Sequence, residues 1–331
     1  MTKVLITGGA GYVGTVLTPQ LLAAGYQVVV YDTCWYGCFL DAHPELTLIK
    51  SDLRDKEALT QALEGVDQVI HLACISNDPS FELDEALSRE INFDCFEPLV
   101  VAAKKAGVRR FIYASSSSVY GVSDAPDVTE EHPLVPLTLY NKYKGLCEPI
   151  LFGHETPDFV CTTIRPATLC GYSPRMRLDL SVNILTNHAV NAGKITVFGG
   201  EQRRPNLHIQ DMCDLYRLLL EVESAKIAGQ IFNVGKENLS IRAIADTVKA
   251  TVEAEFPDRA PIDIVTTPTN DLRSYHVNSD KIARLLGFVP QRGVVDAVRD
   301  LCAAFRAGKL PDSMGAERYS NVKTLKALKA A

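Results

Sequence analysis

Three glycines near the amino terminus constrain this chain more than any other feature of its sequence. Gly8, Gly11 and Gly14 follow the short apolar run Lys3–Thr7 with the spacing Gly-x-x-Gly-x-x-Gly. Apolar residues then recur on one face of a helical pattern over residues 12–24. The segment therefore predicts a buried strand, a glycine turn and a helix in immediate succession.

This arrangement favours dinucleotide binding. One glycine allows the tight bend, one lets the backbone approach a pyrophosphate, and one lets helix and strand pack closely. The amides and the dipole at the helix start then stabilise phosphate charge. A glycine triplet also occurs in loops without a ligand, but here a second apolar run, residues 27–31, ends in Asp32. Its carboxylate suits an adenosine ribose and repels a 2′-phosphate, and no arginine follows directly, so the sequence predicts NAD rather than NADP.

Composition and charge exclude several classes of protein. With 331 residues, 47% of them hydrophobic, the chain is long enough for one large domain or for a large and a small one. A net charge of −6 gives no general attraction to nucleic acid or to an anionic membrane, and we expect neither as a partner. The nine cysteines are scattered without a Cys-x-x-Cys pair, and we see neither a leader nor an apolar run of bilayer length. We therefore expect a cytoplasmic protein with reduced thiols and no metal site.

Further apolar runs predict a doubly wound α/β fold of the Rossmann type. Runs at Leu46–Lys50, 67–72 and 109–114 alternate with helical patterns, which implies a mostly parallel sheet with right-handed crossovers. We expect residues 1–165 to form a NAD-binding Rossmann domain. Residues 166–331 are expected to form mainly a smaller substrate-binding region, with some segments returning to the first domain.

Candidate cofactor residues gather at the carboxyl ends of these strands, where ligands of doubly wound sheets bind. Asp52 follows the third run, and it either accepts from the adenine amino group or caps the helix that begins near Lys56; both roles are compatible. The fourth run ends at Leu72, and Ala73 and Cys74 are small enough for a cofactor to pass close by. The serine run 115–118 follows the fifth.

Tyr140 and Lys144 form a candidate catalytic pair. They are four residues apart at the start of a helical pattern, so they lie on one face, one turn apart. An ammonium beside a phenol favours the phenolate, so we expect the pKa of Tyr140 to be lowered towards working pH. A nearby serine hydroxyl is able to hydrogen-bond the same substrate oxygen. Such a pair is an ordinary surface feature in most proteins, but its combination with a NAD-type turn favours catalysis.

On these motifs the chain resembles the extended short-chain dehydrogenase/reductase family, in particular its nucleotide-sugar epimerases and dehydratases. Residues 7–14, Thr-Gly-Gly-Ala-Gly-Tyr-Val-Gly, are similar to the family's cofactor signature. Residues 115–121, Ser-Ser-Ser-Ser-Val-Tyr-Gly, are similar to its Ser-Ser-x-x-Val-Tyr-Gly segment, in which Ser116 takes the place of the catalytic serine or threonine. Tyr140 and Lys144 match its catalytic pair, and the match extends over most of the chain.

The resemblance implies a role for each residue. Tyr140 would be the general base that removes a proton from a sugar hydroxyl while hydride leaves for NAD, and a 4-keto sugar would result. Lys144 would lower the pKa of the tyrosine and hold the nicotinamide ribose, and Ser116 would orient the hydroxyl. The residues that we expect at the cofactor are Gly8, Gly11, Tyr12, Val13, Gly14, Asp32, Asp52, Leu53, Leu72, Ala73, Cys74, Asn92, Tyr140 and Lys144.

The candidate reactions differ in what happens to the 4-keto sugar after it forms. Family members that remove water across C5 and C6 resemble each other in having Asp-Glu directly after the catalytic threonine, where this chain has Ser117 and Ser118. Neither hydroxyl is a good acid or base near neutral pH, which counts against 4,6-dehydration. A NAD-dependent nucleotide-sugar 4-epimerase is therefore the preferred function. A 4-dehydrogenase or 4,6-dehydratase remains the alternative in chemistry, and a non-catalytic NAD-binding sensor is the alternative from another class.

The later chain resembles the family's substrate region. Asn183 opens a helical stretch after the Arg175 and Arg177 loop, and Arg204 resembles an arginine that binds diphosphate in the family. The segment 270–275 resembles the motif that closes over the nucleotide, but it departs from the commonest form, which leaves the nucleotide open. The expected partner is a nucleotide-diphosphate sugar. The candidate substrate-binding residues are Ser116, Ser117, Asn183, Arg204 and Asp271.

Two helical stretches, 92–106 and 140–152, are able to form a dimer seam of the kind that the family uses. We therefore expect a homodimer.

Overall fold

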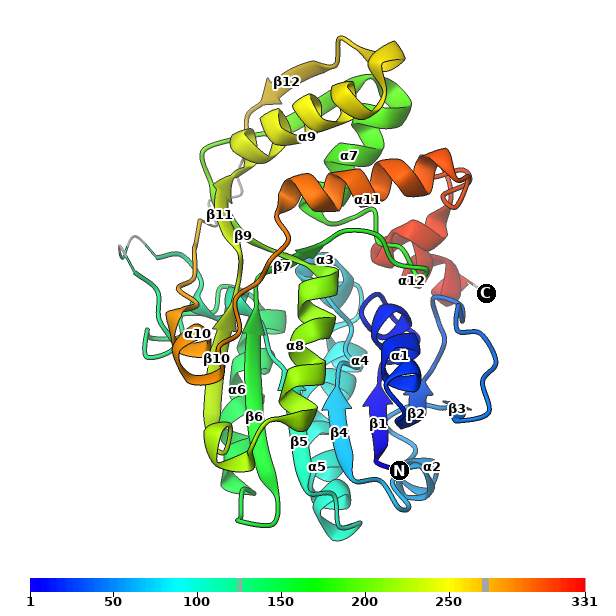
Figure 1. The fold of residues 1–331 in the computed structure, drawn as a ribbon, viewed down its shortest axis with the longest axis vertical. Helices are drawn as coiled ribbons and strands as arrows, with labels where there is room; N and C mark the ends of the chain where they lie inside the picture. The colour runs from blue at the N-terminus through cyan, green and yellow to red at the C-terminus, as the bar shows by residue number, and fades with distance from the viewer. Residues whose placement is uncertain (124, 126, 270–273, 331) are drawn as a thin grey trace.

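The computed structural model describes residues 1–123, 125, 127–269 and 274–330 (Figure 1). Its main element is a seven-stranded sheet in the order β10-β6-β5-β4-β1-β2-β3, with every neighbouring pair parallel. The strands are β1 (Lys3–Thr7), β2 (Gln27–Asp32), β3 (Leu46–Lys50), β4 (Gln68–His71), β5 (Arg110–Ala114), β6 (Val160–Pro166) and β10 (Gln230–Val234). The predicted Rossmann-type α/β fold is confirmed.

Strand β1 lies inside the sheet because both of its faces are apolar. Val4, Leu5 and Ile6 are fully buried, with alternate side chains entering the cores on opposite faces of the sheet. The register places Thr7 beside both Tyr31 of β2 and His71 of β4. The glycine turn that follows Thr7 therefore emerges at the middle of the sheet's carboxyl edge, where the strand order reverses.

Helices cover both faces of the sheet. One face packs against α1 (Gly14–Ala23) and α8 (Ile209–Glu221), and the other against α2 (Lys56–Ala62), α5 (Phe96–Lys105) and α6 (Leu139–Gly153). Helix α10 (Asp280–Leu286) contributes Ile282 to the first of these cores. Short elements connect the layers: α3 (Asp78–Phe81), α4 (Glu85–Arg89) and the 3-10 turns Ser117–Tyr120 and Ser224–Lys226.

The helical pattern expected over residues 92–106 is interrupted in the structure. A π-helical segment, Glu90–Asp94, carries Asn92, and α5 begins only at Phe96. The amide of Cys95 donates to the carbonyl of Glu90, five residues back. Pro98 has no amide hydrogen to donate to Asp94, so a regular α-helical ladder cannot continue through this point.

A smaller region lies beyond the carboxyl edge of the large sheet (Figure 1). Its core joins α7 (Ser181–Ala192), α9 (Ile241–Glu255) and α11 (Val294–Arg306) to the parallel pair β8 (Lys194–Phe198) and β12 (Asp263–Thr267). A three-stranded sheet, β11 (Glu237–Ser240), β9 (Arg203–His208) and β7 (Thr168–Cys170), lies between the two regions. The 3-10 turns Pro257–Arg259 and Glu317–Tyr319 and the C-terminal helix α12 (Asn321–Ala330) complete the described elements.

The chain crosses between the two regions more than once. After the first passage into the smaller region, α8 packs on α1 and β10 pairs with β6. The division at residue 165 stays a prediction, whereas the return of β10 to the large sheet is observed directly.

The packing of the glycine turn generates a stability prediction. A Cβ added at Gly14 would lie 2.2 Å from the carbonyl oxygen of Gly9, so Gly14→Ala forces the start of α1 away from the turn. We expect a loss of about 2 to 3 kcal/mol in the free energy of unfolding, measured by urea denaturation. Gly153→Ala, at the other helix-terminal glycine, is the control, because a Cβ there meets nothing within 4 Å. Equal stability of the two variants would contradict this account.

Candidate active site

A cavity of about 430 Å³ opens at the carboxyl ends of β1, β4 and β5. It brings together residues that are far apart in the sequence, from the glycine turn to the C-terminal helix. The predicted residues that line it are Gly8, Gly11, Tyr12, Val13, Asp32, Asp52, Leu53, Leu72, Ala73, Cys74, Ser116, Ser117, Tyr140, Lys144 and Arg204. Gly14, Asn92 and Asn183 are not among its lining residues, and Asp271 lies outside the described residues.

The glycine turn leaves room for a ligand where a side chain would fill it. Gly8 has a φ of +74°, and a Cβ there would lie 2.6 Å from the amide nitrogen of Ala73. The turn is closed by Gly11, whose amide donates to the carbonyl of Gly8 at 3.1 Å. Because α1 starts directly behind this bend, its amino end faces the cavity wall, an arrangement that suits a pyrophosphate.

Asp32 is tied to the glycine turn by its carboxylate. One oxygen accepts from the amide of Ala10 at 3.0 Å and the other from the amide of Cys34 at 2.7 Å. Burial raises the pKa of Asp32, while these two amides and the charge of Arg175 lower it. The carboxylate lines the cavity at the end of β2, where a ribose diol would be its natural partner.

Asp52 does not cap the following helix. Its carboxylate accepts from the guanidinium of Arg54 at 3.0 Å. Burial acts to raise the pKa of Asp52, but the hydrogen bonds from Arg54 outweigh burial, so the pKa is lowered. Asp55 is the N-cap of α2 and accepts from the amide of Ala58. The capping alternative for Asp52 is therefore wrong, and its position at the cavity wall, next to Leu53, is compatible with an adenine contact.

Asn92 supports the cavity from behind. Its side-chain oxygen accepts from the amide of Ile75 at 2.8 Å, and its side-chain nitrogen donates to the carbonyl of the same residue at 3.0 Å. The side-chain amide of Asn92 thus pairs with the main chain of Ile75 as a neighbouring strand would. The two bonds hold the segment after β4, including Cys74, at the cavity. We therefore expect Asn92 to position this segment rather than to contact the cofactor.

The serine run forms a chain of hydroxyl groups at the end of β5. The Oγ atoms of Ser116 and Ser118 are 2.7 Å apart, and the Ser118 hydroxyl donates to the side-chain oxygen of Asn141 in a very short contact. Ser116 also accepts from the amide of Ser118, so it caps the 3-10 turn that follows. Ser117 is almost fully buried, although some of its atoms reach the cavity wall.

A buried ion pair supports the serine run and the catalytic helix. Arg165 on β6 holds both carboxylate oxygens of Glu148 on α6, at 3.0 and 2.6 Å. Glu148 also accepts from the hydroxyl of Ser115 at 2.6 Å. Both side chains are less than 5% exposed, so the charges are shielded from water and stabilise each other strongly.

Tyr140 and Lys144 both line the cavity, as the helical spacing predicts. The Lys144 ammonium donates to the carbonyl of Ala114 at 2.7 Å and lies over the ring of Tyr113. Burial raises the pKa of Tyr140 well above its ordinary value, and Asp78 adds to the rise. The expectation that the pKa of Tyr140 is lowered towards working pH is therefore wrong in this structure, because burial of the phenol outweighs the lowering effect of the positive charge of Arg177.

Asn183 on α7 is fully buried behind two residues that line the cavity, Tyr12 and Arg177. Its oxygen accepts from the amide of Gly171 at 3.0 Å, and its nitrogen donates to the hydroxyl of Tyr12 and the carbonyl of Arg177. Tyr12 in turn donates to the carbonyl of Gly171 at 2.6 Å. We expect Asn183 to join the glycine turn to the smaller region rather than to contact the substrate.

Comparison with known proteins gives the family. A sequence model described as "NAD dependent epimerase/dehydratase family" matches residues 4–235. The chain belongs to this family. The UDP-glucose 4-epimerase of Mycolicibacterium smegmatis is 30% identical over 92% of this chain and 98% of its own length. The dTDP-glucose 4,6-dehydratase of an Actinoplanes species is 25% identical over 93% of this chain and 98% of its own length.

Solved structures agree with this assignment. The dTDP-glucose 4,6-dehydratase of Streptomyces venezuelae, determined with NAD bound, is 25% identical, with a TM-score of 0.81 over 93% of this chain and 98% of that one. The resemblance to extended short-chain dehydrogenases/reductases is confirmed, and so is NAD as the cofactor. The glycine cradle and the position of Asp32 fit this cofactor.

Metal sites and membrane-spanning helices are two features that the sequence predicts to be absent. Within residues 1–123, 125, 127–269 and 274–330, no group of three or more His, Cys, Asp or Glu residues is arranged to hold a metal ion. No helix over the same residues is long and apolar enough to cross a membrane.

Several residues of this epimerase/dehydratase site escaped the sequence analysis. Ser76 lines the cavity, as does Asn321 at the start of α12. Tyr36 and Tyr275 also line it, and Tyr275 ends the segment 270–275 that the sequence analysis compares with the nucleotide-closing motif. Arg175 and Arg177 also line it, although their sequence context, a short loop with two arginines, is equally typical of a solvated surface. No periodicity in the sequence points to Asn321, because its place in the site follows from where α12 docks.

The environment of Tyr140 generates a spectroscopic prediction. Because burial raises its pKa, we expect the phenol to stay protonated up to at least about pH 10, the ordinary pKa of a tyrosine. The measurement is the difference in tyrosinate absorbance between the wild type and Tyr140→Phe, both without cofactor, during an alkaline titration. A difference signal that appears between neutral pH and pH 9 would show that another charge dominates at the phenol.

Proposed function

We propose that the protein is a NAD-dependent nucleotide-sugar 4-epimerase that acts through a 4-keto intermediate. The observation that carries this proposal is the meeting of Ser116, Tyr140 and Lys144 in the cavity that also contains the glycine cradle and Asp32. Several relatives of similar length, including the M. smegmatis protein, are named UDP-glucose 4-epimerase, which supports the same conclusion.

Each residue has a chemical task in this reaction. NAD, when bound, takes hydride from C4 of the sugar and later returns it. Tyr140 would remove the proton of the C4 hydroxyl and give it back when the ketone is reduced. Because burial raises the pKa of the phenol in the protein without cofactor, this role requires that the positive charge of bound oxidised NAD favour the phenolate. Ser116 orients that hydroxyl, and Lys144, whose ammonium is fixed by Ala114, supplies positive charge at the catalytic helix. Arg204, which lies over the ring of Tyr275 at the cavity, suits the substrate diphosphate.

The serine run supports epimerisation over dehydration. Removal of water across C5 and C6 needs an acid and a base beside the ring, and Ser117 and Ser118 supply only hydroxyl groups. The hydroxyl of Ser118 is already engaged with Asn141 and Ser116. Epimerisation needs only that the ketone turns and takes the hydride back on its other face, so no further acid or base is required.

One observation favours 4,6-dehydration as the second candidate. Asp78 lines the same cavity, and its charge raises the pKa of Tyr140, so a carboxylate does lie near the catalytic phenol. It accepts from the hydroxyl of Thr138 at 2.7 Å. Relatives of similar length are named dTDP-glucose 4,6-dehydratase, which supports this alternative.

The test is incubation of the purified protein with UDP-, GDP-, CDP- and dTDP-sugars, followed by proton NMR. We expect a C4 epimer without accumulating NADH, and a loss of turnover of about 10³-fold in Tyr140→Phe. Tyr143→Phe is the matched control, because Tyr143 lies on the same helix but packs on Phe81 and Phe93.

Other products would redirect the assignment. A free ketone with accumulating NADH means a 4-dehydrogenase. A 4-keto-6-deoxy product that disappears in Asp78→Asn means a dehydratase that uses Asp78 in place of the missing Asp-Glu pair. Full activity of Tyr140→Phe on every sugar that is turned over would leave only the non-catalytic sensor.

We also propose that the protein is a cytoplasmic homodimer. All nine cysteines are free thiols, which suits a reducing compartment. Helix α6 presents Leu146 at its surface with 40% of the side chain exposed, which is compatible with a seam formed by α5 and α6.

The dimer is tested by sedimentation velocity at micromolar concentration, where we expect a mass near twice 36.3 kDa. Leu146→Glu should shift the protein to monomer, because a charge is costly to bury in a helix seam. Leu285→Glu on α10, at an equally exposed leucine, should leave the dimer intact. A monomer in the wild type removes the proposal.

A further inference from the structure

Two buried arginines lie side by side in the wall of the cavity. Arg175 and Arg177, in the loop between β7 and α7, are 3% and 8% exposed. Arg177 forms an ion pair with Asp179 at 2.9 Å, but Arg175 forms none with any carboxylate in the described part of the chain. Among the described residues, Asp179 is thus the one carboxylate at ion-pair distance from either guanidinium group, while Asp32 acts on Arg175 only through its charge. Buried charges are costly unless they are paired.

The charge balance at Arg175 is unfavourable. Burial and, after it, the neighbouring charge of Arg177 together lower the pKa of Arg175 to about 10, although the charges of Asp179 and Asp32 oppose this. The ring of Tyr36, 4.1 Å from the guanidinium carbon, stacks on one face of the group but brings no negative charge. An anion between the two arginines would relieve this repulsion.

Two hydrogen-bond donors of the pair are unused. Nε of Arg175 and Nη2 of Arg177 are buried and have no hydrogen-bond partner among the described residues. Buried donors without partners are rare in folded proteins because each costs free energy. Guanidinium donors are arranged to hold two oxygens of a planar or tetrahedral oxyanion at once, so these two unused N–H groups suit phosphate oxygens.

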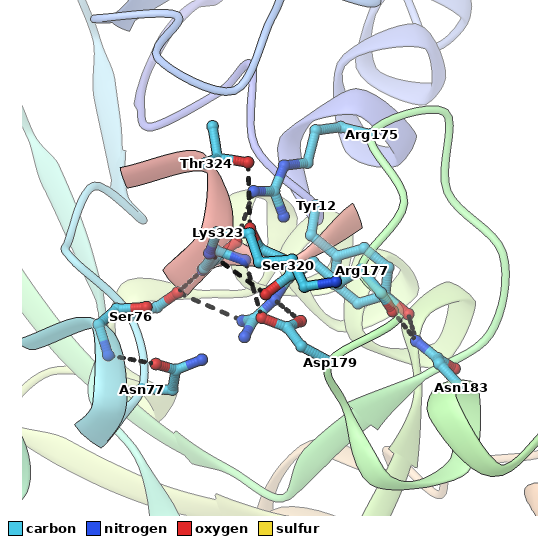
Figure 2. Close-up of polar contacts among 12 residues, drawn as sticks. Tyr12, Ser76, Asn77, Arg175, Arg177, Asp179, Asn183, Ser320, Lys323 and Thr324 are labelled. Atoms are coloured by element: carbon cyan, nitrogen blue, oxygen red, sulfur yellow. Dashed lines mark hydrogen bonds and ion pairs between the residues drawn. The ribbon is translucent and has the colours of Figure 1, made fainter. Parts of the chain in front are cut away.

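The arginine loop is tied to the glycine turn. The amide of Arg175 donates to Oγ1 of Thr15 at 3.4 Å, and Thr15 donates to the carbonyl of Gly11 at 3.0 Å. Ser173 in the same loop donates to the carbonyl of Tyr12 at 2.7 Å. The main chain of Arg175 thus lies beside the first turn of α1, whose amide groups and dipole also favour a phosphate. Figure 2 shows Arg175, Arg177 and Tyr12 in one view.

The C-terminal helix holds both arginines through one residue. The side-chain oxygen of Asn321, at the start of α12, accepts from Arg175, and its side-chain nitrogen donates to Ser76 at 2.9 Å. Ser76 also accepts from Arg177 at 3.2 Å, and the amide of Asn321 donates to Asp179 at 3.0 Å. Asn321 is 2% exposed and is therefore shielded from solvent. Figure 2 shows Ser76, Arg177 and Asp179 of this network.

We propose that Arg175 and Arg177 form a clamp for a diphosphate group, and that Asn321 is the positioning residue that fixes the clamp from α12. The diphosphate is that of the cofactor, because the arginine loop is bonded to the residues of the glycine turn. This inference rests on the cofactor part of the proposed function and is independent of which sugar is converted. The diphosphate of a nucleotide sugar has the same chemistry, and the experiment distinguishes the two sources.

The test compares calorimetric binding of adenosine, ADP-ribose and UDP to the wild type and to Arg175→Gln. Loss of a charged hydrogen-bond donor should weaken ADP-ribose binding by about 10- to 100-fold. Adenosine binding should not change, because adenosine lacks the diphosphate. Arg242→Gln removes the same charge from an exposed pair with Asp246 on α9, away from the cavity, and serves as the matched control.

Asn321→Ala tests the positioning role. It should weaken ADP-ribose binding less than Arg175→Gln does, and the double variant should bind no more weakly than Arg175→Gln alone, because both act through one guanidinium. Losses that simply add, or an equal loss for adenosine, would make Asn321 a structural residue only.

Three results decide the proposal. ADP-ribose binding to Arg175→Gln at the wild-type level overturns it. A loss confined to UDP overturns the cofactor assignment and gives the clamp to the nucleotide sugar. If Arg175→Gln fails to fold, inorganic pyrophosphate is titrated into the wild type, where competition with ADP-ribose supports the clamp and absence of competition overturns it. None of these measurements needs turnover, so failure of the sugar panel and failure of the clamp remain distinguishable.

Discussion

The site depends on the close contact between the glycine turn and the backbone around it. At Gly8 and Gly14 an added Cβ would lie 2.6 and 2.2 Å from main-chain atoms, so the turn fits only as glycine. This contact places the start of α1 at the middle of the sheet edge, where Asp32 bonds back to the amide of Ala10. The arginine loop is attached to the same turn through Thr15 and Tyr12. A shift of the turn would therefore move the glycine cradle, the carboxylate of Asp32 and the arginine loop together.

Two pairs of buried charged groups near the cavity differ in how far their charges are neutralised and their hydrogen-bond donors are used. Glu148 and Arg165 neutralise each other through two hydrogen bonds, and their surroundings need no ligand. Arg175 and Arg177 have one ion pair between them among the described residues, that of Arg177 with Asp179, and both retain unused donors. The first pair stabilises the scaffold behind the serine run, whereas the second is an incomplete arrangement that an anion completes. Buried charges that neutralise each other thus indicate a structural pair, whereas buried charges that lack a full set of partners indicate a binding site.

Most of the residues with a local sequence signal are ones that the structure brings to the cavity wall. The spacing of Gly8, Gly11 and Gly14, the position of Asp32 and the interval between Tyr140 and Lys144 are set by neighbours in the sequence, and all but Gly14 line the cavity. The pKa of Tyr140 was predicted in the wrong direction, because the local rule counts a charge one turn away but not burial by distant segments. Asn92 and Asn183 were assigned to ligands, yet their amides are occupied by main-chain groups and Tyr12, which no sequence pattern reveals.

The sequence by itself determined the succession of strands and helices along the chain, the glycine turn and the spacing of Tyr140 and Lys144, because hydrophobic periodicity and backbone freedom are properties of short segments. Only the tertiary structure decided which of the arginines are buried and what closes the site. Asn321 reaches the cavity from the far end of the chain, and β10 joins the large sheet after a long excursion. Such contacts depend on how distant surfaces pack, and burial, which sets both the charge balance of Arg175 and the pKa of Tyr140, exists only once they have packed.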